Sequence, residues 1–134
     1  MTTAYWRAVL CYVLPTFPLG YVWHLVAFKS YYEALEVYRT DILIPFGILS
    51  MIVQGCVWAF LYRRLFAGEP IIRGAAKFMS FALPLAWSYL VIAVAAKHLM
   101  ASVSGFVLIE TAFMIVQFLI VSPLIAWSFA QRRA

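Results

Sequence analysis

The stretch Gly105–Phe129, GFVLIETAFMIVQFLIVSPLIAWSF, decides the fold of this chain. Its one charged residue is Glu110, and nearly all the other side chains are apolar. A helix needs roughly 20 such residues to cross a hydrocarbon core of about 30 Å. The stretch therefore predicts a transmembrane helix.

Three more apolar runs of this kind precede it, at about 5–27, 42–62 and 76–96. Basic residues in these runs, such as Lys77, lie near their ends. The strands of a membrane barrel would instead alternate polar and apolar residues over about ten positions, and these runs do not alternate. We expect an all-α protein, an antiparallel four-helix bundle that forms a single transmembrane domain over residues 1–134.

The composition supports the same fold class. The chain is 66% hydrophobic and only 11% charged, whereas soluble domains have about 25% charged residues. The net charge of +5 does not indicate nucleic-acid binding, because the basic residues sit at run ends where phospholipid headgroups lie. Cys11 and Cys56 fall inside apolar runs, as buried small hydrophobes do, and form no metal or disulfide motif. No small-residue cleavage site follows the first run, which we treat as a retained helix.

The basic residues also predict the orientation, since short cytoplasmic loops carry an excess of Lys and Arg. One side of the predicted membrane has only Lys29, Arg39 and Lys97. The other side has Arg7, Arg63, Arg64, Arg73, Lys77, Arg132 and Arg133. We therefore expect both termini in the cytoplasm.

The first outer loop, residues 28–41, has a pattern of its own. Tyr31, Leu35 and Tyr38 recur at helical spacing among charged residues. This fits either a short amphipathic helix on the outer membrane face or an aromatic belt that extends the first helix. In both cases Tyr31 and Tyr38 are candidates to face lipid or a partner.

Two polar residues are placed to cap the helices that follow the outer loops. Asp41 precedes the second helix, with Pro45 in the first helical turn, and Ser104 precedes the fourth. Both are residue types that favour the N-cap position.

Glu110 and His24 are candidates for ion or proton handling, because ionisable groups at membrane depth are costly and often functional. Counted from the midpoints of their helices, they lie roughly 10 and 12 Å toward the outside. A contact is therefore possible if the first and fourth helices are neighbours. The pair could carry protons near an outer vestibule, or could be a hydrogen bond that locks two helices together.

A second polar set lies near mid-membrane. Gln54 and Gln117 occupy the second and fourth helices, and Ser50 and Gly47 share a helix face with Gln54. The commoner meaning of such a stripe is close helix packing held by amide hydrogen bonds. The alternative is a substrate path lined by amides.

Other candidates are weaker. His24 and His98, on the first and third helices, could hold a b-type haem, although His98 lies some 6 Å further out by helical rise. Trp87 lies near the middle of the third helix and could face lipid, a pigment or a partner subunit. No spacing of His, Cys, Asp and Glu indicates a metal site.

Several short strings together resemble a group of small, uncharacterised bacterial inner-membrane proteins with four predicted helices. They are Trp23-His24, Ile44-Pro45, Leu61-Tyr62-Arg63-Arg64, Ala96-Lys97-His98, and Glu110-Thr111 followed by Gln117. The resemblance implies a bacterial source, the inner membrane and a four-helix fold. It implies no substrate and no catalytic residue.

The sequence favours a non-enzymatic role, since it has no phosphate-binding loop, nucleophile elbow or HExxH pair. The first hypothesis is an accessory subunit of a larger membrane complex, or a self-associating bundle. The alternative is a small dimeric transporter or channel coupled to protons through Glu110. A haem or quinone electron carrier is a distant third.

Overall fold

The structure is a computed structural model and describes residues 2–130, which contain helices and no strand. Arg132 and Arg133, which entered the prediction of orientation, lie outside the described residues. The elements in chain order are α1 (Thr3–Val22), η1 (Trp23–Ala27), α2 (Lys29–Leu35), α3 (Ile44–Leu65), α4 (Ile71–Trp87), η2 (Ser88–Ile92), α5 (Ala93–Ala95) and α6 (Val103–Phe129).

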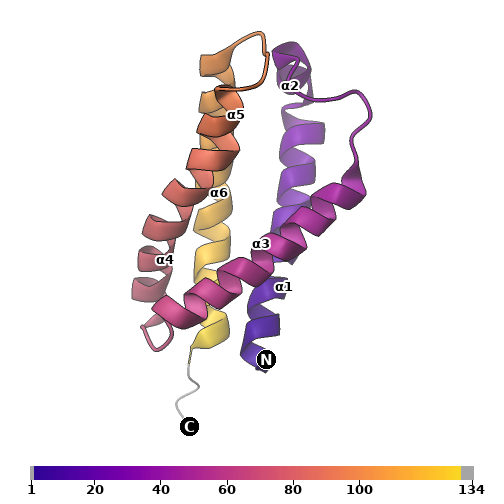
Figure 1. Cartoon of the computed structure of the whole chain (residues 1–134). Coiled ribbons are helices and arrows are strands. Elements are labelled where there is room, and N and C mark those ends of the chain that lie inside the picture. The colour runs from indigo at the N-terminus through magenta and orange to yellow at the C-terminus, as the bar shows by residue number, and fades with distance from the viewer. Residues whose placement is uncertain (1, 131–134) are drawn as a thin grey trace.

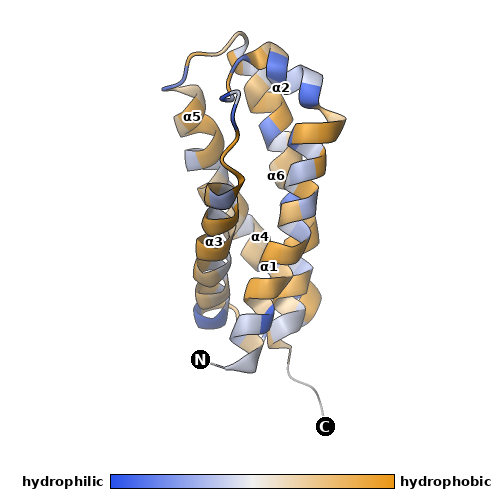
Figure 2. Cartoon of the chain, turned by 90° about the vertical axis from the view of Figure 1, so that its right-hand side faces the viewer, coloured by the Kyte–Doolittle hydropathy of each residue, from blue (hydrophilic) through white to orange (hydrophobic). Residues whose placement is uncertain are grey.

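Four continuous helical stretches are long and apolar enough to cross a membrane, as the sequence predicts. They are Thr3–Ala27, Ile44–Leu65, Ile71–Ala95 and Val103–Phe129. The start of α1 and the end of α6 lie at the same end of the bundle, and α2 lies at the other end (Figure 1). Apolar residues cover the middle of the helices, and hydrophilic residues gather toward the two ends (Figure 2).

The helix α6 is the centre of the arrangement, because it packs along both α1 and α4. The first and fourth helical stretches are therefore neighbours, as a contact of His24 with Glu110 requires, and so are the third and fourth. α3 packs chiefly on α1, and it crosses the other helices obliquely (Figure 1).

Two of the four membrane stretches contain a π-helical turn, which the sequence did not predict. In η1 the amide of Phe28 bonds the carbonyl of Trp23 at 3.0 Å, five residues back. η1 and η2 each begin four or five residues after a helix proline, Pro18 and Pro84. A proline removes one backbone hydrogen bond from the helix, and π-helical turns are frequent at functional sites.

Of the two alternatives for the first outer loop, the structure has a short helix, α2, and it is shorter than the spacing of the aromatic residues suggested. It ends at Leu35, and Glu36 adopts a left-handed conformation with φ of 56°. Tyr38 therefore lies beyond the helix. The side chains that α2 buries against the bundle are Tyr32 and Leu35, while Tyr31 is 40% exposed.

Both predicted helix caps were wrong. The N-cap of α3 is Leu43, which has no capping side chain, and Asp41 pairs with Arg39 instead. The N-cap of α6 is Ser102, whose hydroxyl accepts a hydrogen bond from the Gly105 amide at 3.1 Å. α6 begins earlier than expected, so Ser104 lies inside its first turn.

An aromatic core fills the end of the bundle that carries the termini. Trp58, Tyr62, Phe78 and Phe118 are all at most 3% exposed and contact one another edge to face or tilted. α3 approaches α1 closely at Gly55, where a Cβ atom would lie 3.3 Å from the rings and methyls of Tyr12 and Val9. This half of the molecule is tightly packed.

The turn between α3 and α4 is held by an ion pair. Gly68 has φ of 94°, a conformation that favours glycine. Next to it, Glu69 accepts a hydrogen bond from Lys77, and this bond holds the pKa of the Glu69 carboxyl below its ordinary value.

Candidate functional site

The structure brings Glu110 and His24 into contact in the half of the bundle that carries α2. His24 Nε2 lies 3.2 Å from Glu110 Oε1, and both side chains are largely buried, at 17% and 12% exposure. η1 carries the histidine and α6 carries the carboxyl group. The contact that the sequence allowed is therefore present, and it joins the first and last spans.

The hydrogen-bond partners of this pair limit where a shared proton can lie. His24 Nδ1 lies 2.8 Å from the carbonyl oxygen of Gly20, which can only accept, so Nδ1 must carry a hydrogen. A hydrogen bond between Nε2 and Glu110 then requires one proton, either as an imidazolium with a carboxylate or as a neutral imidazole with a carboxylic acid. In both of these forms the pair has no net charge.

Aromatic rings surround the pair. The centroid of the His24 ring lies 4.5 Å from that of Phe113, 4.8 Å from Tyr32 and 5.9 Å from Tyr38. Tyr38 donates a hydrogen bond to Glu110 Oε1 at 3.1 Å, and it stacks on Tyr32 with centroids 5.1 Å apart. Burial, and next the charge of Glu110, raises the pKa of the Tyr32 hydroxyl, which therefore stays neutral at physiological pH.

The mid-membrane polar residues form a second network, centred on Tyr12. Its hydroxyl donates to Gln54 Oε1 at 2.6 Å and accepts from Gln117 Nε2 at 3.2 Å. Gln54 Nε2 donates to Ser50 Oγ at 2.9 Å, and Gln117 also donates to Thr16 at 3.3 Å. The network joins α1, α3 and α6, and it connects the amides that the sequence had singled out.

Both networks line one cavity of about 580 Å³. Glu110 and Gln117 are seven residues apart on α6, so the two polar levels are separated by roughly 10 Å of helical rise. The walls between them are largely apolar and include Phe17, Met51 and Phe113. The cavity is therefore polar at two depths and apolar between them.

The cavity opens at the end of the bundle that carries α2 and along the side where α3 stands apart from the bundle. At its mouth are Arg39 and Ile42 of the α2–α3 loop and His98 beyond α5, all of them exposed. From Ile44 to Ser50 every residue of α3 is exposed, because this half of α3 stands apart from the bundle. Toward the termini the aromatic core of Trp58, Phe78 and Phe118 lies beyond the Tyr12 network. The space is a blind vestibule.

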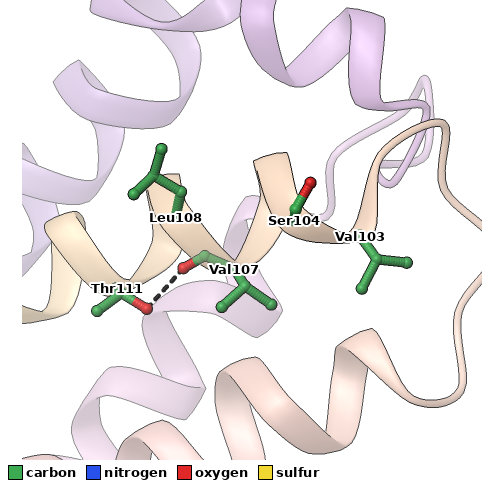
Figure 3. Close-up of a pocket in the computed structure, with 5 residues that line it drawn as sticks. All are labelled: Val103, Ser104, Val107, Leu108 and Thr111. Carbon is green, nitrogen blue, oxygen red and sulfur yellow. Dashed lines mark hydrogen bonds between the residues drawn. The ribbon is translucent and has the colours of Figure 1, made fainter.

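A second depression lies on the outer surface of α6 and is lined by Val103, Ser104, Val107, Leu108 and Thr111 (Figure 3). It is wide open and has no ionisable group in its lining. The Thr111 hydroxyl is already engaged, since it donates to the Val107 carbonyl at 2.5 Å and accepts from Trp87 Nε1 at 2.8 Å. The vestibule is the better candidate site.

The remaining candidates from the sequence lie as follows. Trp87 is half-buried and bonded to α6, so its indole N–H faces another helix of the same chain. Tyr31 is partly exposed and donates to the Gly105 carbonyl at 3.2 Å. His98 lies at the mouth of the vestibule, but both ring nitrogens of His24 already have partners. Ligation of a haem by His24 would require its bond to Glu110 to break.

Sequence reasoning missed Tyr12, the centre of the inner network. A signal was present: Tyr12, Thr16, Gly20 and His24 follow one another at steps of four and so share one face of the first helix. Every one of them is in the vestibule lining or bonded to it. Within residues 2–130 no group of three or more His, Cys, Asp and Glu could hold a metal ion.

No family model, no curated protein and no solved structure matches this chain.

Proposed function

We propose that this chain is a non-enzymatic, multi-pass protein of the bacterial inner membrane and that two copies form a small proton-coupled carrier. The bundle end with the termini would face the cytoplasm, since it carries Arg7, Arg63, Arg64, Arg73 and Lys77. The vestibule would then open to the outside. The proposal combines self-association with a transport role for Glu110.

The observation that carries the proposal is the blind vestibule with its polar floor. Transporters bind their substrates near the bilayer midplane, in sites that face one side at a time. Here a cavity leads from one membrane face to the Tyr12–Gln54–Gln117 network and stops there against a packed aromatic core. A channel would need a path through that core, so a carrier fits the geometry better.

The Glu110–His24 pair is suited to couple such a carrier to protons. The hydrogen bond between its two members requires one proton, and the pair lines the vestibule and is mostly shielded from solvent. Ionisable residues in membrane spans commonly mark ion and proton pathways. The pair would release its proton to the outside when substrate binds and take up a proton again when substrate leaves. The flux of substrate would then be linked to a flux of protons.

Self-association is part of the proposal because one copy leaves the vestibule with an incomplete wall. The half of α3 from Ile44 to Ser50 is exposed throughout, and α3 makes its main contacts with α1 rather than with α4 or η2. A second copy packed on this half of α3 would close the wall.

The test is transport by purified protein in liposomes. With a pH gradient imposed across the membrane, we expect solute-dependent proton flux for the natural chain and none for Glu110→Gln. Glu69→Gln serves as the matched control, because it removes a carboxylate in the α3–α4 turn, away from the vestibule. Absence of flux for cationic, anionic and neutral solutes alike, or equal flux in Glu110→Gln, would overturn the proposal.

The second candidate is an accessory subunit of a larger membrane complex. The same exposed half of α3 favours it, since another membrane protein could cover this surface as well as a second copy could. Isolation in a mild detergent, followed by mass spectrometry and by measurement of the particle mass, separates the two. A homodimer supports the carrier, and a stoichiometric foreign subunit supports the accessory role.

A further inference from the structure

We infer that the vestibule binds a lipophilic monovalent cation and that binding releases the proton of the Glu110–His24 pair. The inference rests on the proposed carrier function and names its substrate class. The structure of the site supports it through its charge balance, its aromatic rings and its shape.

The charges that line the vestibule leave a place for one cation. Arg39 is compensated by Asp41, since its Nε and Nη2 atoms donate to the two carboxylate oxygens at 3.1 and 3.2 Å. The remaining carboxyl group is Glu110, whose ionisable contacts are His24 and Tyr38, the latter as a neutral hydroxyl that donates to it. When the pair loses its proton, the histidine is neutral and the site carries one negative charge.

Loss of that proton also changes the contact itself. With Nδ1–H bonded to the Gly20 carbonyl, a deprotonated pair would place the lone pair of Nε2 against a carboxylate oxygen. Two acceptors in contact repel each other, and this repulsion is strong in a weakly polar site. A cation beside Glu110 offsets it. The balanced exchange is therefore a protonated site plus a cation giving a cation-bound site plus one proton, with no change in net charge.

The rings around Glu110 favour an organic cation over a metal ion. Tyr38 and Phe113 line the vestibule next to Glu110, and His24 and Tyr32 pack against them. Clustered aromatic faces attract quaternary and other weakly hydrated cations, as in aromatic cages. A small hard cation would require several oxygen ligands, and this site offers one carboxylate.

The shape and the walls set the size and polarity of the ligand. A volume of about 580 Å³ lies within the range of roughly 300–1,000 Å³ typical of sites for drug-sized molecules. The walls between the two polar levels are largely apolar, so a hydrophobic body is preferred. An anion of the same size would meet the Glu110 carboxylate, and of the other basic side chains in the lining Arg39 is paired with Asp41 and His98 lies at the mouth.

The experiment compares three probes of similar size and different charge on the purified full chain in detergent. They are tetraphenylphosphonium, tetraphenylborate and neutral triphenylphosphine oxide, and binding is measured by titration calorimetry in buffers of different ionisation enthalpy. We expect the cation to bind with release of about one proton, so that its affinity rises up to tenfold per pH unit. The neutral and anionic probes should bind at least tenfold more weakly.

Two variants test the site itself. Glu110→Gln should lose the proton release and most of the cation affinity, while Glu69→Gln should keep both. Glu110→Gln also removes a contact between two helices and so can change the folding of the chain. The proton release measured with the natural chain therefore tests the inference independently of this variant. Equal binding of the three probes, or cation binding without proton release, would overturn the inference. If those results were found together with proton-coupled flux of another solute in liposomes, the assignment of a cation as the substrate would be wrong, and the proposed carrier function would stand.

Discussion

Replacing Tyr12 by phenylalanine tests whether the inner network holds the spans together. The substitution keeps the ring, which is 2% exposed, and removes only the hydroxyl. That hydroxyl makes two hydrogen bonds, to Gln54 and from Gln117. The change therefore breaks the direct link between the amides of α3 and α6.

The magnitude follows from what the two amides lose. A hydrogen bond between membrane helices contributes about 0.6 kcal/mol on average, so two bonds give roughly 1 kcal/mol. An unpaired buried polar group adds about 1–3 kcal/mol. Gln54 keeps its bond to Ser50, and Gln117 keeps its bond to Thr16, so the penalty is at the low end. We expect Tyr12→Phe to lower the free energy of unfolding by about 1–3 kcal/mol.

The assay is reversible unfolding in mixed micelles of a mild detergent and dodecyl sulfate, followed by tryptophan fluorescence. Tyr21→Phe is the matched control: it removes the same hydroxyl from the same helix, at a side chain that is 47% exposed. We expect little change in the control. If both variants lose the same stability, the network does not contribute to the fold and its hydrogen bonds are incidental.

Three further predictions use matched pairs or a single titration. Gly55→Val should destabilise the chain by about 1–3 kcal/mol, because a Cβ atom at this position would lie 3.3 Å from side chains of α1. Gly47→Val should not, because nothing lies within 4 Å of a Cβ atom there. Unfolding in mixed micelles measures the stability of both variants. Ser102→Ala should cost about 1 kcal/mol through loss of the N-cap and Ser104→Ala much less, and equal losses would contradict the capping assignment. The pKa of Glu69 is lowered by its lysine partner, so its contribution to stability is complete above the ordinary carboxyl pKa and is lost as pH falls through the lowered value. Between neutral pH and that acid range, the thermal unfolding temperature of the natural chain should therefore fall by more than that of Glu69→Gln. Parallel pH profiles of the two proteins would refute this.

The sequence predicted the spans well because hydrophobic length is a local property. Each of the four predicted runs overlaps a helix of the structure, with ends that differ by a few residues. The caps were less predictable, since Ser102 and Ser104 are both good N-cap residues and the choice depends on where the preceding turn ends. A difference of two residues in the start of α6 moved the cap from one to the other.

The candidate site could be predicted in part. Glu110 and His24 stood out because charge is rare at membrane depth, and their similar depths allowed the contact. Tyr12 did not stand out, because a tyrosine in an apolar run is ordinary, and only its partners on α3 and α6 reveal its role. The vestibule itself depends on the oblique path of α3, which no local pattern encodes.

The two π-helical turns bear on how a carrier of this design would move. Both lie in the half of the bundle that holds the vestibule: η1 carries His24, and Leu90 of η2 lines the cavity. The other half is closed by the buried aromatic core around Phe78 and Phe118. π-helical turns and helix prolines are where helices bend, whereas a packed core resists gradual deformation. The segments η1 and η2 can therefore bend toward α3 more easily than the aromatic core can part. In the proposed carrier, closure of the vestibule around a ligand would therefore precede any opening at the end of the bundle that carries the termini.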